Sequence, residues 1–172
     1  PRLHAAASRW YEDHGRFVPA IDHALEARDH ARAAALLSRH ADELLGQGRM
    51  RLLSRWFDAL PEPLLQDRPG LLLARAWAMA FTRSPNEAMD LLDRIDAAQA
   101  ADPGIAAQLP ALRLVLLANM DEVERACAAG EASLAKLPTS NPFADNVLTN
   151  TLASVYSMSG RQEEARRLLD RA

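Results

Sequence analysis

Small and hydrophobic residues recur along the chain at helical spacing, in stretches that end at glycine or proline. Near the C-terminal end, Leu152, Ala153 and Tyr156 lie at positions i, i+1 and i+4, which places them on one face of a helix. Gly160 follows this stretch, as glycine commonly does where a helix ends in a left-handed residue. Ala165 then lies in a second helical stripe. The pattern predicts two helices joined by a tight turn.

This pattern occurs five times. In each copy, a first position with a small or aliphatic residue is followed twelve residues later by a second such position. The first positions are Ser8, Ala41, Ala76, Leu114 and Ala153. The second positions are Ala20, Leu53, Ala88, Ala126 and Ala165. Both series advance by 33, 35, 38 and 39 residues. A period in the mid-thirties with two helices per unit is typical of tetratricopeptide-type solenoids. We predict an all-α fold, a tetratricopeptide-like right-handed superhelix of about five antiparallel helix pairs, with an unrelated helical bundle as the alternative.

Glycine and proline divide the chain into about ten expected helices. The expected positions are residues 3–14, 19–28, 30–45, 49–60 and 67–83, then a sixth helix from residue 84, a seventh after 104, an eighth over 121–137, a ninth after 142 and a tenth after 160. Ser84 is placed to cap the sixth helix, with Pro85 at its first position. Pro110 is expected to kink or restart the seventh.

Composition agrees with a helical domain. The 172 residues are 49% hydrophobic and rich in Ala, Leu and Arg, and the chain has only seven glycines. This length suits one domain over residues 1–172 with a sizeable core. Cys127 is the single cysteine, so an internal disulfide is excluded and a reducing, cytoplasmic location is expected.

Charge and hydropathy limit the partners. The net charge is −3 and the pI is about 6.0, which gives no basic footprint for nucleic acid. The sequence shows no leader segment and no apolar run of about 18 residues. We therefore expect no binding to nucleic acid by this segment and no membrane span.

Several local segments, taken in order, resemble the helical domain of the MalT-like, large ATP-binding LuxR-type transcription regulators. These segments are residues 10–15, 20–27, 33–37, 40–41, 47–49, 56–61, 68–69 and 76–77. The resemblance covers about residues 3 to 95, and beyond them only general tetratricopeptide features remain. It implies that the chain is one part of a larger regulator, which also has a nucleotide-binding domain, a winged-helix segment and a C-terminal helix-turn-helix.

In that family, an inducer that binds the superhelix is coupled to nucleotide-dependent self-association and DNA binding. The phosphate-binding pattern Gly-x-x-x-x-Gly-Lys-Ser/Thr is absent from these 172 residues. The resemblance thus assigns ATP and DNA binding to the parent protein, and it implies a small-molecule inducer or a protein partner, with self-association, for this segment. No cofactor is expected.

No catalytic motif is evident, and we expect no enzyme. The histidines, His4, His14, His23, His30 and His40, form no pair at i, i+3 or i+4 and no zinc-like spacing with Cys127. Cys127 itself is interpreted as a small helical filler. Clusters of arginine and glutamate, such as residues 161–167, are interpreted as solvated helix faces.

Binding is expected on the concave face of the solenoid, which the first helix of each unit lines. Register along those helices predicts nine residues there: Arg9, Glu12, Asp42, Trp77, Phe81, Asn119, Asn150, Ser154 and Ser157. Trp77 and Phe81 are i, i+4 neighbours suited to stacking on a sugar, aromatic or acyl ligand. A register shift would instead make Trp77 a core residue, which is the favoured interpretation for that side chain.

Two functions fit this pattern. The first is an effector-sensing domain of a transcription regulator, in which ligand binding shifts a conformational equilibrium. The second is a tetratricopeptide scaffold that holds a peptide or partner helix in its groove. A concave pocket that is both polar and aromatic favours the sensor, and a long basic or asparagine-rich groove favours the scaffold.

Overall fold

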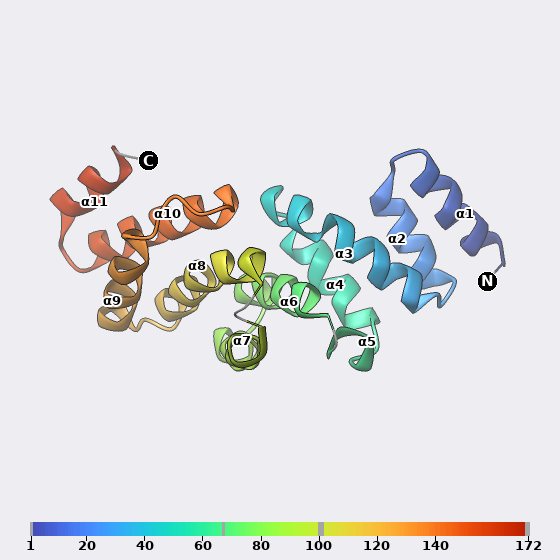
Figure 1. Cartoon of the computed structure of the whole chain (residues 1–172), viewed down its shortest axis with the longest axis horizontal. Coiled ribbons are helices and arrows are strands. Elements are labelled where there is room, and N and C mark those ends of the chain that lie inside the picture. The colour runs from blue at the N-terminus through green and yellow to red at the C-terminus, as the bar shows by residue number, and fades with distance from the viewer. Residues whose placement is uncertain (1, 67, 100–101, 171–172) are drawn as a thin grey trace. The chain divides into compact units, whose positions relative to one another are not determined.

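In this computed structural model the described residues are 2–66, 68–99 and 102–170, and they form eleven α-helices and no strand (Figure 1). The helices are α1 (Arg2–Asp13), α2 (Phe17–Glu26), α3 (His30–Gly46), α4 (Met50–Ala59), α5 (Pro63–Gln66), α6 (Pro69–Thr82), α7 (Pro85–Gln99), α8 (Pro103–Asn119), α9 (Val123–Leu134), α10 (Pro142–Met158) and α11 (Gln162–Leu169). The all-α class predicted from periodicity is confirmed. None of the described helices is long and apolar enough to cross a lipid bilayer.

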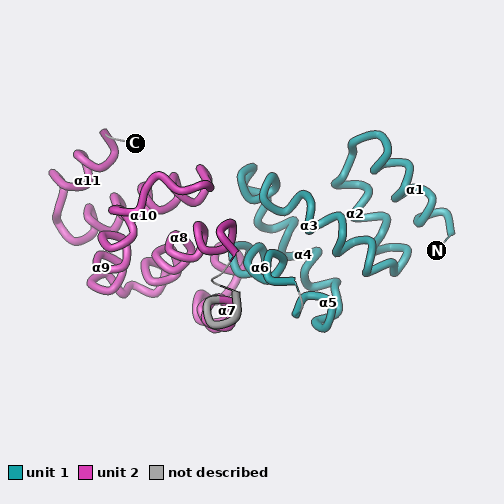
Figure 2. Tube along the Cα trace, in the orientation of Figure 1, with its two compact units in different colours: residues 1–78 teal, residues 79–172 magenta. Residues whose placement is uncertain are grey.

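The chain divides into two compact units, residues 1–78 and 79–172, and the boundary falls within α6 (Figure 2). In unit 1, α2 packs against both α1 and α3, and α3 contacts α4 and α5. In unit 2, α8 packs against α7, α9 and α10, and α10 also packs against α9 and α11. Each unit is therefore a layered array of neighbouring helices, as expected of a helical repeat. A single domain over residues 1–172 stays a prediction.

The repeat markers form part of the core. All ten positions of the two series are buried, and none exposes more than 6% of its surface. Small side chains at these positions let neighbouring helices approach closely, and the larger buried residues fill the spaces behind them. The period in the sequence thus reflects a repeated helix contact.

The turn between the paired helices is also repeated. Seven residues after the first marker, the chain adopts a left-handed conformation at Gly15, Gly48, Asp121 and Gly160, with φ of 67°, 69°, 58° and 80°. In each case the next backbone N–H donates to the carbonyl five residues earlier at 2.8 to 3.0 Å, a Schellman ending. The third unit differs because α6 ends at Thr82 and α7 begins at Pro85.

Three helix predictions need correction. The short helix α5 follows Pro61, where only a break was expected. α2 begins at Phe17, so Pro19 is its third residue and still lies in the first turn. The N–H groups of the first turn have no intrahelical acceptor, so the N–H that proline lacks costs the helix no hydrogen bond. Pro110, where a kink or a restart was expected, lies inside α8, which continues through it without a restart and has buried residues on both sides of the proline; the kink stays a prediction.

A polar network joins the last three helices. The Tyr156 hydroxyl donates to Glu131 at 3.1 Å, and Arg161 donates to Glu131 at 2.8 Å and to both oxygens of Glu164 at 2.7 and 2.6 Å. The Arg161 guanidinium also lies 4.1 Å from the centre of the Tyr156 ring. These contacts hold the pKa of Glu164 below its ordinary value near 4.5, mainly through the hydrogen bonds from Arg161.

The lowered pKa of Glu164 predicts a loss of stability in acid. A carboxyl whose pKa is lower in the folded state stabilises the protein above its unfolded pKa, and this contribution disappears as the pH falls through the folded pKa. We expect the wild type to melt at a higher temperature than Glu164→Gln at pH 7, and the difference to shrink once the pH falls below the ordinary glutamate pKa and to vanish as it falls through the lower folded-state pKa. Thermal melts followed by circular dichroism from pH 7 to 3 measure it. Glu163→Gln changes the charge equally at an exposed site and should show a smaller difference; an equal difference would contradict the assignment.

Candidate functional site

Unit 2 contains a hollow of about 330 Å³ near the C-terminal ends of α6, α8 and α10. Its lining residues are Phe81 from α6; Val115, Ala118 and Asn119 from α8; and Asn150, Thr151, Ser154, Val155 and Met158 from α10. We call it the α6–α8–α10 hollow. Its volume lies at the lower end of the range for small-molecule sites.

The hollow has an apolar floor and an apolar wall. Val115 and Val155 are buried, with 4% and 1% of their surface exposed, and they form the floor. Phe81 and Met158 line the hollow while exposing 52% and 61% of their surface. Exposed large apolar side chains around a concave surface are typical of binding sites.

Two amide side chains have a defined orientation in this hollow. The Asn150 Nδ2 atom donates to the backbone oxygen of Asn146 at 2.9 Å, and the Asn119 Nδ2 atom donates to the backbone oxygen of Ala80 at 3.0 Å. A backbone carbonyl only accepts, so the amide nitrogen is the donor in both bonds, and each side chain keeps its Oδ1 atom and one N–H for further hydrogen bonds. The exposed hydroxyl of Ser154 adds a group that can donate or accept.

The structure brings together four of the nine residues predicted for the concave face: Phe81, Asn119, Asn150 and Ser154 all line the hollow. Ser157 is exposed on α10 outside the lining. Asn119 also has a structural role, because its side-chain amide donates a hydrogen bond to the Ala80 carbonyl in the last turn of α6, which has no donor partner within the helix. Replacing Asn119 therefore also removes a hydrogen bond between α8 and α6.

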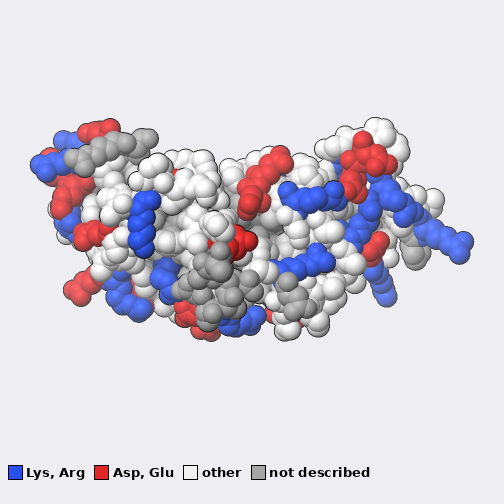
Figure 3. All heavy atoms as spheres, viewed as in Figure 1, with Lys and Arg blue, Asp and Glu red and all other residues white. Residues whose placement is uncertain are grey.

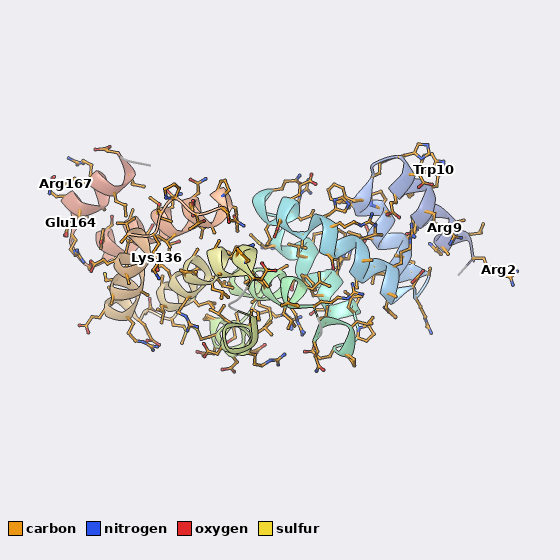
Figure 4. All side chains as sticks on the ribbon, viewed as in Figure 1. Arg2, Arg9, Trp10, Lys136, Glu164 and Arg167 are labelled. Carbon is orange, nitrogen blue, oxygen red and sulfur yellow. The ribbon has the colours of Figure 1, made fainter. Side chains whose placement is uncertain are left out.

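The other four predicted residues belong to unit 1. Arg9 and Asp42 are exposed on α1 and α3, and Figure 4 labels Arg9 beside Trp10 on α1. Glu12 pairs with both Arg32 and Arg39, so its carboxylate braces α1 against α3. A single concave face that spans both units stays a prediction.

Trp77 needs a correction as a site residue. Its side chain is fully buried, with 0% of its surface exposed, so it cannot stack on a ligand in a groove. Trp77 follows the buried marker Ala76 in the middle of α6, where neighbouring helices cover it, whereas Phe81, four residues later near the end of α6, is half exposed. The core interpretation of Trp77 is the one that the structure supports.

Sequence reasoning missed five residues of the hollow, namely Val115, Ala118, Thr151, Val155 and Met158. Helical spacing contained a signal for one of them: Met158 lies four residues after Ser154 and eight after Asn150, on the same side of α10. The contribution of α8 depends on its packing against α10, which no local pattern reveals.

Two histidines far apart in sequence meet in unit 1. The Nδ1 atoms of His4 and His23 lie 2.8 Å apart, and the His23 ring stacks on Tyr11 at 5.4 Å. One imidazole therefore donates to the other and ties α1 to α2. The described residues contain no group of three or more side chains placed to hold a metal ion.

Charged side chains of both signs are interspersed over the face shown in Figure 3. By contrast, none of the described residues that line the α6–α8–α10 hollow is Lys, Arg, Asp or Glu. The hollow therefore differs from the surrounding surface in being aliphatic, aromatic and amide-lined.

The chain is similar to segments of two kinds of curated protein. It is 31% identical over 158 residues to the serine/threonine-protein kinase PknK of Mycobacterium tuberculosis (strain CDC 1551 / Oshkosh), a match that covers 88% of this chain and 14% of that protein. It is 30% identical over 170 residues to the HTH-type transcriptional regulator MalT of Yersinia enterocolitica, covering 96% of this chain and 19% of that protein. The MalT of Yersinia pestis is 29% identical over 170 residues, with the same coverage.

The chain thus spans less than a fifth of the length of these relatives. The resemblance to MalT-like regulators is confirmed, and it extends over nearly the whole chain rather than over residues 3 to 95 alone. No family model and no solved structure matches the chain.

Proposed function

We propose that this chain is the effector-sensing and oligomerisation domain of a cytoplasmic, ATP-dependent LuxR-type transcription regulator, and that it binds a small inducer in the α6–α8–α10 hollow. The similarity to MalT over 170 residues supports the regulator class. In this proposal the domain has no catalytic activity and binds no nucleic acid itself.

The hollow is the observation that carries the proposal. It combines exposed apolar surface from Phe81 and Met158 with amide and hydroxyl groups from Asn150 and Ser154, and such mixed lining gives affinity and orientation together. Its walls come from different helices. A ligand that contacts all of them favours one packing of α8 against α10 over others, which is how binding shifts a conformational equilibrium.

A protein-interaction scaffold is the second candidate. Phe81 and Met158 are large, exposed and apolar, and such residues also accept the apolar face of a partner helix. A helix partner requires contacts at intervals of three or four residues along a groove, whereas an inducer requires only the hollow. Binding of small compounds therefore favours the sensor.

A thermal-shift screen against sugars, acyl compounds and amino-acid metabolites tests the sensor. We expect at least one compound to raise the melting temperature of the wild type, and Asn150→Ala and Ser154→Ala to weaken that compound by about 3- to 30-fold, which corresponds to the loss of one or two hydrogen bonds. Calorimetric titration measures the affinities.

Ser157→Ala is the matched control, because Ser157 is exposed on α10 outside the hollow. It should leave affinity unchanged. A ligand whose affinity is the same in wild type, Asn150→Ala and Ser154→Ala would place the site elsewhere. ATP hydrolysis or DNA binding by this chain would contradict the proposal as a whole.

A further inference from the structure

Two histidines meet at the contact between α1 and α2 in unit 1. The two helices pack side by side (Figure 1), and the buried hydroxyl of Ser8 in α1 donates to the backbone oxygen of Ala20 in α2 at 2.8 Å. His4 lies one turn before Ser8, and His23 lies three residues after Ala20. Because the helices are antiparallel, these opposite steps bring the two imidazoles together on one side of the Ser8–Ala20 contact.

The other four copies of the repeat have no histidine at these two positions. Four residues before the first marker and three after the second, they carry the pairs Leu37 and Trp56, Leu72 and Leu91, Pro110 and Ala129, and Thr149 and Leu168. Six of these eight residues are buried. Apolar and small side chains are therefore sufficient for packing at this place in the repeat, and the two imidazoles of the first copy add a capacity that packing does not require.

The two imidazole nitrogens are as far apart as two ligands of one metal ion. The Nδ1 atoms of His4 and His23 are separated by 2.8 Å, and the ring planes are inclined at 40° with their centres 5.0 Å apart. Metal–nitrogen bonds of about 2.0 Å separate two ligands by about 2.8 Å at a right angle and by about 3.3 Å at the tetrahedral angle. The observed separation fits the right angle, which is the geometry of Cu(II) and Ni(II).

Both imidazoles are held in place and still reach solvent. The His23 ring stacks on the Tyr11 ring, with the centres 5.4 Å apart and the planes 11° from parallel, while the Ser8–Ala20 hydrogen bond holds the two helices together. His4 and His23 are each only partly buried. Water can therefore complete the coordination of an ion, and the ordering of the ligands costs little on binding.

We propose that His4 and His23 together bind one divalent transition-metal ion, Ni(II) or Cu(II), through their Nδ1 atoms, with water in the remaining positions. In the metal-free protein one imidazole donates from Nδ1 to the other. A metal ion needs both Nδ1 lone pairs, so the donating ring moves its proton to Nε2 and stays neutral. The ion then replaces the shared proton as the link between α1 and α2.

The proposed metal site goes beyond the proposed function and is independent of it. Both ligands belong to unit 1, whereas the residues that line the α6–α8–α10 hollow belong to unit 2. Local spacing did not predict the site, because its two ligands are nineteen residues apart in the sequence.

Calorimetric titration of the full chain, without an affinity tag, tests the site with Ni(II) and Cu(II) salts at about pH 7.5, above the ordinary pKa of histidine. We expect one ion per chain. His4→Asn and His23→Asn should each weaken binding by at least about 10-fold, because each removes one of two ligands. His14→Asn is the matched control, since His14 is exposed on α1 and contacts Trp10 rather than another histidine; it should leave affinity unchanged.

Two measurements on the wild type do not depend on whether the variants fold. Electron paramagnetic resonance of bound Cu(II) should show coupling to two imidazole nitrogens. Circular dichroism melts should show a higher melting temperature with Ni(II), because the two histidines come together only in the folded chain. In His23→Asn, if it is folded, this Ni(II)-dependent increase should disappear.

Three results would overturn the metal site. One is the absence of binding by the wild type at millimolar Ni(II) and Cu(II). Another is a Cu(II) spectrum with one coupled nitrogen. The third is binding that is as tight in folded His23→Asn as in the wild type, which would place the ion on His4 without its partner. None of these results bears on the α6–α8–α10 hollow, which the compound screen tests separately.

Discussion

Replacing Trp56 with alanine is expected to lower the free energy of unfolding of this protein by about 3–5 kcal/mol, the usual cost of removing a large aromatic side chain from a core. Trp56 lies in α4 with only 1% of its surface exposed. Its indole nitrogen donates to the Oδ1 atom of Asp22 in α2 at 2.7 Å, and Arg55 donates to the same oxygen at 2.7 Å. The substitution therefore removes buried apolar contacts and the hydrogen bond that joins α4 to α2.

Trp10→Ala is the matched control, because Trp10 exposes 52% of its surface on α1 and stacks on His14 at 4.0 Å. We expect it to change stability by less than about 1 kcal/mol. Urea unfolding followed by far-ultraviolet circular dichroism measures both variants without depending on tryptophan fluorescence. Similar losses for the two variants would contradict the burial of Trp56. Trp56→Phe should fall between them, since it retains the ring but not the donor.

Replacing Gly130 with alanine is expected to cost about 1–3 kcal/mol, although it adds one methyl group and improves helix propensity. Gly130 is buried in α9 at its contact with α10. A Cβ atom there would lie 2.6 Å from Cδ1 and 3.2 Å from Cγ of Leu152. Leu152 is fully buried, so it cannot rotate away without displacing its own neighbours.

Gly46→Ala is the matched control, since a Cβ atom on Gly46, the last residue of α3, meets nothing within 4 Å. It should be neutral or stabilising by up to about 1 kcal/mol. Urea unfolding of both variants and of Gly130→Ala combined with Leu152→Val measures the coupling. If the shorter valine recovers none of the loss caused by Gly130→Ala, the close contact between α9 and α10 is not its cause.

The sequence by itself determined the helical class, the position of most helices and the repeat. These properties depend on local physics: the spacing of apolar residues along a helix, and the glycines that permit a left-handed turn at Gly15, Gly48 and Gly160. Where the local signal was absent, prediction was weaker. Asp121 adopts the same left-handed turn with φ of 58° although no glycine marks it, and α8 continues through Pro110, where a restart was one of the two expected outcomes.

Only the tertiary structure decided which side chains of these helices are available to a ligand. Trp77 and Phe81 lie four residues apart on α6, yet one is fully buried and the other is half exposed, because exposure depends on which neighbouring helix covers each position. Glu12 and Asn119 both looked free in sequence, but Glu12 pairs with two arginines of α3 and Asn119 bonds to a carbonyl of α6. The α6–α8–α10 hollow likewise exists because residues far apart in the chain pack together, which helical period alone does not specify.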